Sequence, residues 1–81
     1  MVTVLRAEGL RVVIFANDHP PAHVHVIAGR GEAKINLLGP DLVWADGLTR
    51  AELRRALRLV AEQRPYLLDR WEAIHERPRH G

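Results

Sequence analysis

The chain has 81 residues, a formal net charge of +2 at neutral pH and no cysteine. A chain of this length forms one small domain, here residues 1–81, which buries only about 60% of the surface of its unfolded state. The absence of cysteine excludes disulfides and thiolate metal sites as sources of stability. The start of the chain lacks the charged-then-apolar plan of a secretory signal, and the longest apolar run is too short to cross a bilayer. We therefore expect a cytoplasmic protein without membrane contact.

The first predicted elements are two strands, residues 2–6 and 10–16, joined by a turn. Both segments are rich in β-branched and aromatic residues, and Glu8 and Gly9 between them are typical turn residues. The pattern predicts a β-hairpin. Because side chains alternate along a strand, the second strand divides into two sets. The core set is Leu10, Val12 and Ile14, and the opposite set is Arg11, Val13 and Phe15.

The segment after this hairpin holds three of the five histidines, together with an aspartate and two adjacent prolines. Pro20 and Pro21 cannot donate backbone hydrogen bonds and hold the residues before them extended, so the segment cannot be helical. We predict a stiff loop over residues 17–22. This loop should bring Asp18 and His19 close to the start of the next strand.

Histidine and valine alternate in residues 23–28, which is the period of a strand. His23 and His25 then point to one face of the sheet and the valines to the other. The valines belong to a core, because they are the apolar set. We therefore expect both imidazoles on an open face.

A second hairpin follows, because Gly29 and Arg30 suit a two-residue turn into a strand at residues 31–37. A one-residue slip would set the histidines against apolar residues, so the pattern fixes the register. The predicted polar pairs across this hairpin are His25 with Lys34 and His23 with Asn36.

The rest of the chain changes to a helical period. Residues 42–44 form a short apolar segment whose type the pattern leaves open. Thr49 and Glu52 have the spacing of a capping box, which places the helix start at Thr49. An apolar stripe with spacings of three and four continues across Pro65. This favours one long helix over residues 49–76, kinked or broken near the proline.

These elements predict an α+β domain: a four-stranded antiparallel sheet of two hairpins, with one long C-terminal helix packed on one face. Residues 77–81 should form a frayed tail. Trp44 and Trp71 are expected in the core, since Trp71 lies on the apolar stripe. The uncovered sheet face is too apolar for idle solvent surface and predicts a partner protein or a second copy of the chain. Its residues are His23, His25, Ile27, Lys34, Asn36, Val13 and Phe15.

Eleven of the twelve cations are arginine, whose planar guanidinium suits phosphates and carboxylates. Arg50, Arg54 and Arg58 recur every four residues of the helix, away from the apolar stripe. Like charges at that spacing slightly destabilise a helix, so this arginine ridge indicates an anionic partner such as nucleic acid or an acidic protein. A solvated face is the alternative. Candidate contacts to the same kind of partner on the sheet face are Arg11, Phe15 and Asn36.

Three hypotheses fit the histidine face. His23 and His25, with Asp18 or His19 as a third ligand, could bind a zinc or nickel ion. Alternatively, without metal, one imidazole could take the proton from a ribose 2′-hydroxyl and the other protonate the leaving oxygen while Lys34 holds the phosphate. In the third, the loop residues form only local hydrogen bonds and the strand histidines belong to an interface without chemistry.

Several motifs extend over nearly the whole chain. They are Thr3-Val4-Leu5-Arg6, Asn17-Asp18-His19-x-Pro21-x-His23-Val24-His25-Val26, Ala33-x-Ile35-x-Leu37, Gly47-Leu48 and Trp71. In these motifs the chain resembles a family of small bacterial proteins classified as domain of unknown function 4160. Ala22 departs from the family pattern, which usually has a second consecutive proline there. The resemblance implies a toxin-antitoxin context, with a partner protein encoded nearby and, more weakly, a toxin role.

Together these observations predict a toxin-antitoxin-type protein that acts on RNA through its histidine face, as a metal-independent endoribonuclease if it is an enzyme. The rival is a non-enzymatic protein-binding or DNA-regulatory module, the antitoxin side of such a pair. No cofactor is expected unless the metal hypothesis holds. The candidate catalytic residues are His23, His25, Lys34, His19 and Asp18.

Overall fold

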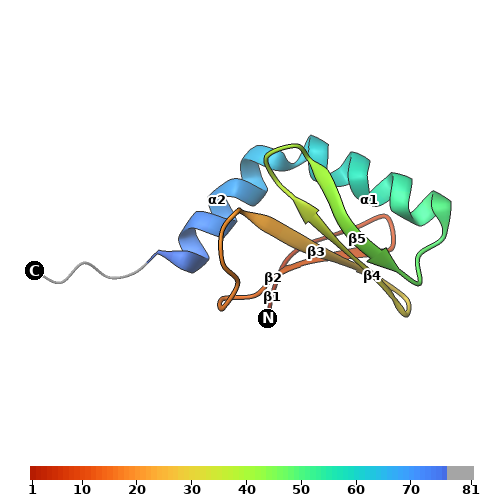
Figure 1. Cartoon of the computed structure of the whole chain (residues 1–81), viewed down its shortest axis with the longest axis horizontal. Helices are drawn as coiled ribbons and strands as arrows, with labels where there is room; N and C mark the ends of the chain where they lie inside the picture. Colours follow the sequence, from red (N-terminus) through yellow and green to blue (C-terminus); the bar gives the residue numbers. More distant parts are fainter. Residues whose placement is uncertain (77–81) are drawn as a thin grey trace, which may run out of the picture.

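The computed structural model describes residues 1–76, which form an antiparallel sheet with two helices on one face (Figure 1). The strands lie in sequence order, so each pairs with its neighbour in the chain. The strands are β1 (Val2–Ala7), β2 (Leu10–Ile14), β3 (His23–Ala28), β4 (Gly31–Asn36) and β5 (Asp41–Asp46), and the helices are α1 (Arg50–Glu62) and α2 (Arg64–His75). The α+β class and the two predicted hairpins are therefore confirmed.

The sheet has five strands rather than the four predicted. β5 pairs with β4, but its register shifts between Leu42 and Trp44, which face the adjacent residues Ile35 and Lys34. A bulge of this kind adds one residue to a strand and breaks the period of two. Three apolar residues therefore stand in a row in β5, and their pattern did not indicate a strand.

The single long helix predicted for residues 49–76 is two helices. α1 ends at Glu62, and Gln63 leaves helical geometry with φ −102° and ψ 14° before α2 begins. Pro65 then lies in the first turn of α2, where its missing N–H removes no helical hydrogen bond. The start of α1 is as predicted. The Thr49 hydroxyl accepts from the Glu52 N–H at 3.0 Å, and the Glu52 carboxylate accepts from the Thr49 N–H at 2.8 Å.

The hydrophobic core fills the space between the sheet and the helices. The predicted core residues of β2 are buried, and the β3–β4 register is the predicted one, with His25 opposite Lys34 and His23 opposite Asn36. Core residues from the other strands and from the helices include Val24, Val26, Ile35, Leu59, Val60, Leu67 and Trp71. None of the helices within residues 1–76 is long and apolar enough to cross a membrane. The tail predicted at 77–81 lies outside the described residues.

Candidate functional site

A tight turn places Asp18 beside the two strand histidines. The Asp18 N–H donates to the Phe15 carbonyl at 3.0 Å, which bends the chain back immediately after β2. The carboxylate atom Oδ2 then lies 3.0 Å from Nε2 of His23 and 3.6 Å from Nε2 of His25. The predicted delivery of Asp18 to the start of the histidine strand is therefore confirmed.

The backbone fixes the orientation of the His23 ring. Its Nδ1 lies 2.9 Å from the Pro21 carbonyl oxygen, which can only accept a hydrogen bond, so Nδ1 carries the proton and donates it. In the neutral ring, Nε2 then has a lone pair. Only 3% of His23 is exposed. The backbone carbonyl of Pro21 thus holds the Nε2 lone pair of His23 toward Asp18.

A carboxylate orients the second ring in the same way. Nδ1 of His25 lies 2.8 Å from Oε2 of Glu32, so it donates to that acceptor and leaves Nε2 free to point toward Asp18. The rings of Phe15 and Trp44 meet the His25 ring edge-on, with centroids 4.8 and 6.0 Å away. The imidazole is therefore held by one hydrogen bond and two aromatic contacts.

In the neutral forms of both rings, the three side chains bring lone pairs together at one point. One donor atom from each of Asp18, His23 and His25 lies within 4.8 Å of the others. Oδ2 of Asp18 and Nε2 of His23 are buried and make no hydrogen bond, although they are 3.0 Å apart. Buried polar atoms are almost always paired, so two unpaired acceptors in contact require an explanation. We call these three residues the donor cluster.

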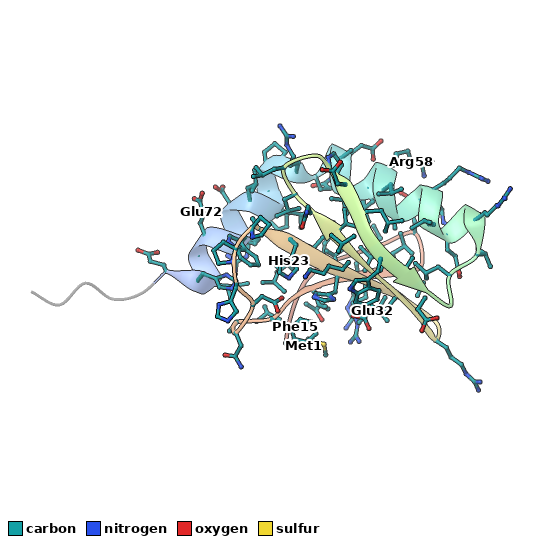
Figure 2. The ribbon with its side chains drawn as sticks, in the orientation of Figure 1. Met1, Phe15, His23, Glu32, Arg58 and Glu72 are labelled. Atoms are coloured by element: carbon teal, nitrogen blue, oxygen red, sulfur yellow. The ribbon has the colours of Figure 1, made fainter. Side chains whose placement is uncertain are left out.

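The expectation that both imidazoles lie on an open face is wrong. His23 and His25 are only 3% and 9% exposed. The loop after β2 folds back over this face, Phe15 and Trp44 pack on the His25 ring, and Trp71 of α2 contacts the His23 ring. Figure 2 shows Phe15 and Glu32 on the side of the sheet away from Arg58 and the helices. Side chains from the sheet, from the loop after β2 and from α2 together bury the histidines.

Residues 9–72, most of the chain, match the sequence profile of a family described as a domain of unknown function (DUF4160). The chain belongs to the DUF4160 family. The matched region contains the whole donor cluster, from Asp18 to His25. No curated protein and no solved structure matches the chain. The family resemblance is confirmed, and the toxin-antitoxin context stays a prediction.

A hollow of about 430 Å³ opens beside the donor cluster of this DUF4160 domain. Asp18 and His23 line it, together with the predicted site residues His19, Lys34 and Asn36. His19 is exposed and is not among the clustered donors, so of the two candidates for a third ligand only Asp18 lies with the histidines. The structure thus brings three predicted site residues, Asp18, His23 and His25, into the cluster. Three more, His19, Lys34 and Asn36, line the hollow beside it.

Two residues of the site were not predicted. Glu32 holds His25 from β4, one position diagonal to the predicted His25–Lys34 pair, and diagonal neighbours in a sheet lie within reach of long side chains. The predicted register therefore contained the information needed to place Glu32 near His25. His75 stacks on Trp71 with centroids 3.8 Å apart, and Trp71 in turn contacts His23 at 5.1 Å. Only the packing of α2 against the sheet could reveal the contact between Trp71 and His23.

The two tryptophans differ in environment. Trp71 is 7% exposed, as expected of a core residue, whereas Trp44 is 41% exposed on the edge strand, so its predicted core position is wrong. The residue lies on β5, which has no further strand beyond it among residues 1–76.

The arginine ridge does not share a surface with the donor cluster. Arg50, Arg54 and Arg58 are exposed on α1, in the helix layer, while the cluster lies on the opposite face of the sheet (Figure 2). Arg58 is also paired with Glu8 at 2.7 Å. Arg11 lies on the histidine face opposite Ile27, one row further along β2. The ridge and the histidines are therefore separate candidate surfaces.

Proposed function

We propose that this protein binds one divalent transition metal ion, zinc or nickel, through Oδ2 of Asp18 and Nε2 of His23 and His25. The observation that carries the proposal is the pair of buried acceptors, Oδ2 and the His23 Nε2, 3.0 Å apart without a hydrogen bond. A cation between them would satisfy both lone pairs. Burial of unpaired polar atoms is otherwise unfavourable by about 1–3 kcal/mol each.

The spacing of the donors suits a metal ion. Zinc bonds to imidazole nitrogen and carboxylate oxygen are about 2.0–2.2 Å, so two ligands of a tetrahedral ion are about 3.3 Å apart. The observed separations from Oδ2 of Asp18, 3.0 Å to His23 and 3.6 Å to His25, lie on either side of this value. Modest movement of the rings would close the coordination shell.

The partners of the two imidazoles also support the proposal. Metal-ligating histidines almost always donate their other ring N–H to a carbonyl or a carboxylate, which fixes the tautomer. His23 does this with the Pro21 carbonyl and His25 with Glu32. Both rings therefore have the hydrogen-bonding pattern of ligands before any ion is bound.

Three protein ligands leave a coordination position for water or substrate, as in catalytic zinc sites. Two of the three ligands, Asp18 and His23, line the hollow of about 430 Å³, through which water could reach a bound ion. The donor set of nitrogen and oxygen suits zinc and nickel, and the chain offers no thiolate that would favour a closed structural site.

Isothermal titration calorimetry on tag-free protein with zinc and with nickel tests this proposal. We expect about one equivalent to bind, and Asp18→Asn to weaken binding by at least about tenfold, because loss of second-shell partners alone is worth 10- to 100-fold. His19→Ala is the matched control, since it removes a neighbouring exposed histidine outside the cluster. An absence of heat with both metals, or equal weakening by His19→Ala, would overturn the proposal.

We also propose RNA as the substrate class, in the toxin-antitoxin context that the family resemblance implied. The supporting observation is that Lys34 and Asn36 line the same hollow as Asp18 and His23, so a cation and an amide lie beside two of the proposed ligands. A bound metal would supply an activated water at neutral pH. Lys34 would hold a phosphate next to it.

The metal-independent form of this activity has less support. Both imidazoles already use Nδ1 for a fixed hydrogen bond, and their side chains are only 4% and 11% exposed. A ribose hydroxyl of bound RNA would therefore have little access to either imidazole. Purified protein should cleave structured or single-stranded RNA only after metal is added, and Lys34→Ala should reduce that cleavage. Equal cleavage in the presence of a chelator would favour the metal-independent form.

Expression with and without the neighbouring gene tests the biological role separately. Growth arrest that the neighbouring gene relieves would support a toxin with an encoded partner. No effect on growth would favour the rival proposal, a non-enzymatic protein-binding or DNA-regulatory module of the antitoxin kind. Neither result bears on metal binding, which calorimetry measures directly.

A further inference from the structure

The outer edge of β5 is open and apolar. All six residues of β5 are exposed, and Leu42, Val43 and Trp44 are 41%, 46% and 41% exposed. β5 pairs with β4 on one side and is the last strand of the sheet within residues 1–76. An edge strand presents unpaired backbone N–H and C=O groups that can pair with another chain.

The opposite edge of the sheet, formed by β1, is protected from pairing with another chain. In β1, most residues are partly buried, and the Tyr66 hydroxyl donates to the Val4 carbonyl at 2.9 Å. β1 also carries Arg6, a charge of the kind that prevents edge pairing. Between Leu42 and Ala45, β5 has neither a charge nor a proline. Of the two edges, that of β5 is the less protected, because its only protective features are the bulge and the two terminal aspartates.

Exposed apolar side chains concentrate at this edge. Among residues 1–76, seven large hydrophobic residues are exposed, and four of them lie within residues 38–44, including Leu38 at 68%. Because of the bulge, Leu42 pairs with core-facing Ile35 and Trp44 pairs with Lys34 on the histidine face. An added strand would therefore find an apolar neighbour on each face of the sheet. Patches of this kind mark interaction sites more often than scattered single residues do.

The charges of β5 indicate what kind of segment would bind. Asp41 and Asp46 stand at the two ends of the strand, and β5 contains no cation. In the two-fold antiparallel pairing of two β5 strands, Asp41 of each copy would face Asp46 of the other, and like charges directly opposite are destabilising. A segment with apolar residues between lysines or arginines would place its cations against both carboxylates.

We propose that β5 binds an extended segment of a partner protein as an additional strand, and that this segment has an apolar centre flanked by basic residues. Backbone hydrogen bonds would supply affinity, and side chains beside Leu42 and Trp44 would supply specificity, as in other strand additions. The bulge at Val43 interrupts the edge, so the partner pairs over two short stretches. Val43 also lines the hollow and Trp44 packs on the His25 ring, so Leu42, which lies outside both the hollow and the donor cluster, is the β5 residue that separates this interface from the metal site.

A panel of synthetic hexapeptides with apolar centres tests the proposal, each made in a lysine-flanked and a glutamate-flanked form. Binding to the full chain would be measured by the change in tryptophan fluorescence, with Trp44→Phe to assign the signal to β5. We expect lysine-flanked peptides to bind about tenfold or more tightly than their glutamate-flanked versions, with a difference that shrinks as salt is raised. If no lysine-flanked peptide binds, or if both forms bind equally, the proposal fails.

Two edge variants locate the binding surface. Leu42→Lys should weaken peptide binding by about tenfold or more, because a charge in the middle of an edge blocks pairing. Val2→Lys, at the 37% exposed Val2 on the other edge, should leave it unchanged. An intact thermal transition in both variants shows that the sheet is folded. Equal loss in both variants, or a dimer in sedimentation that Leu42→Lys dissociates, would overturn the assignment to a partner protein.

Discussion

Nε2 of His23 and Oδ2 of Asp18 lie 3.0 Å apart in the interior of the protein, yet neither atom takes part in a hydrogen bond. The His23 ring donates from its other nitrogen to the Pro21 carbonyl, so in the neutral ring two acceptors face each other. This contact is unfavourable without a cation or a proton between the atoms. It therefore predicts how the metal-free protein responds to substitution.

Asp18→Asn should stabilise the metal-free protein while it weakens metal binding. The introduced amide can donate to Nε2 of His23, and one hydrogen bond is worth about 1 kcal/mol. For a domain of this size, that corresponds to a rise in Tm of about 4–8 °C in the presence of a chelator. Thermal denaturation followed by circular dichroism measures it. A lower Tm would show that an imidazolium–carboxylate pair, rather than two facing acceptors, holds the metal-free cluster.

Glu32→Ala should weaken metal binding although Glu32 is not itself one of the proposed metal ligands. Its carboxylate accepts from Nδ1 of His25 at 2.8 Å and so fixes which nitrogen faces the metal. Loss of such a partner lowers metal affinity by about 10- to 100-fold. Glu8→Ala is the matched control, because Glu8 pairs with Arg58 in a surface ion pair. Calorimetry with zinc should separate the two variants, and an unchanged affinity for Glu32→Ala would contradict the proposed geometry.

Arg54→Ala should affect RNA binding and leave metal binding intact. Arg54 is exposed on α1, across the sheet from the donor cluster, so it can contact RNA only as part of the arginine ridge. Each phosphate contact adds about 0.7–0.9 to the slope of log affinity against log salt, and losing one should lower that slope by this amount. Filter binding at several salt concentrations measures the slope. If the unmodified protein and Arg54→Ala had the same slope, Arg54 would not contact RNA, and the arginine ridge would not be part of the RNA interface.

Thr49→Ala should destabilise the fold by about 1 kcal/mol, since it removes the side-chain acceptor of the helix cap. In the structure the Thr49 hydroxyl accepts from the Glu52 N–H, and the Glu52 carboxylate accepts from the Thr49 N–H. Thr49→Ser keeps the hydroxyl and should retain most of the stability. Urea denaturation compares the two variants. Equal loss in both would mean that the methyl group, and not the hydroxyl, stabilises this position.

The sequence by itself determined the parts of this protein that depend on local pattern. The β3–β4 register follows from alternation, because a one-residue slip would set His25 against Ile35. The start of α1 follows from the capping box, which requires only residues three positions apart. The turn after β2 brings Asp18 to His23 across five residues of chain, a distance that a proline-stiffened loop can span.

Only the tertiary structure decided how these parts meet. Asp18 rather than His19 joins the histidines, and Glu32 orients His25, because these contacts depend on side-chain directions that spacing alone leaves open. The imidazoles are buried because Phe15, just after β2, and Trp44 of β5 pack over His25 while Trp71 of α2 contacts His23. Contacts between residues so far apart in the chain leave no pattern in the sequence. The fifth strand escaped prediction for a related reason: its bulge breaks the alternation that identifies a strand, while its pairing with β4 is established only once the sheet has formed.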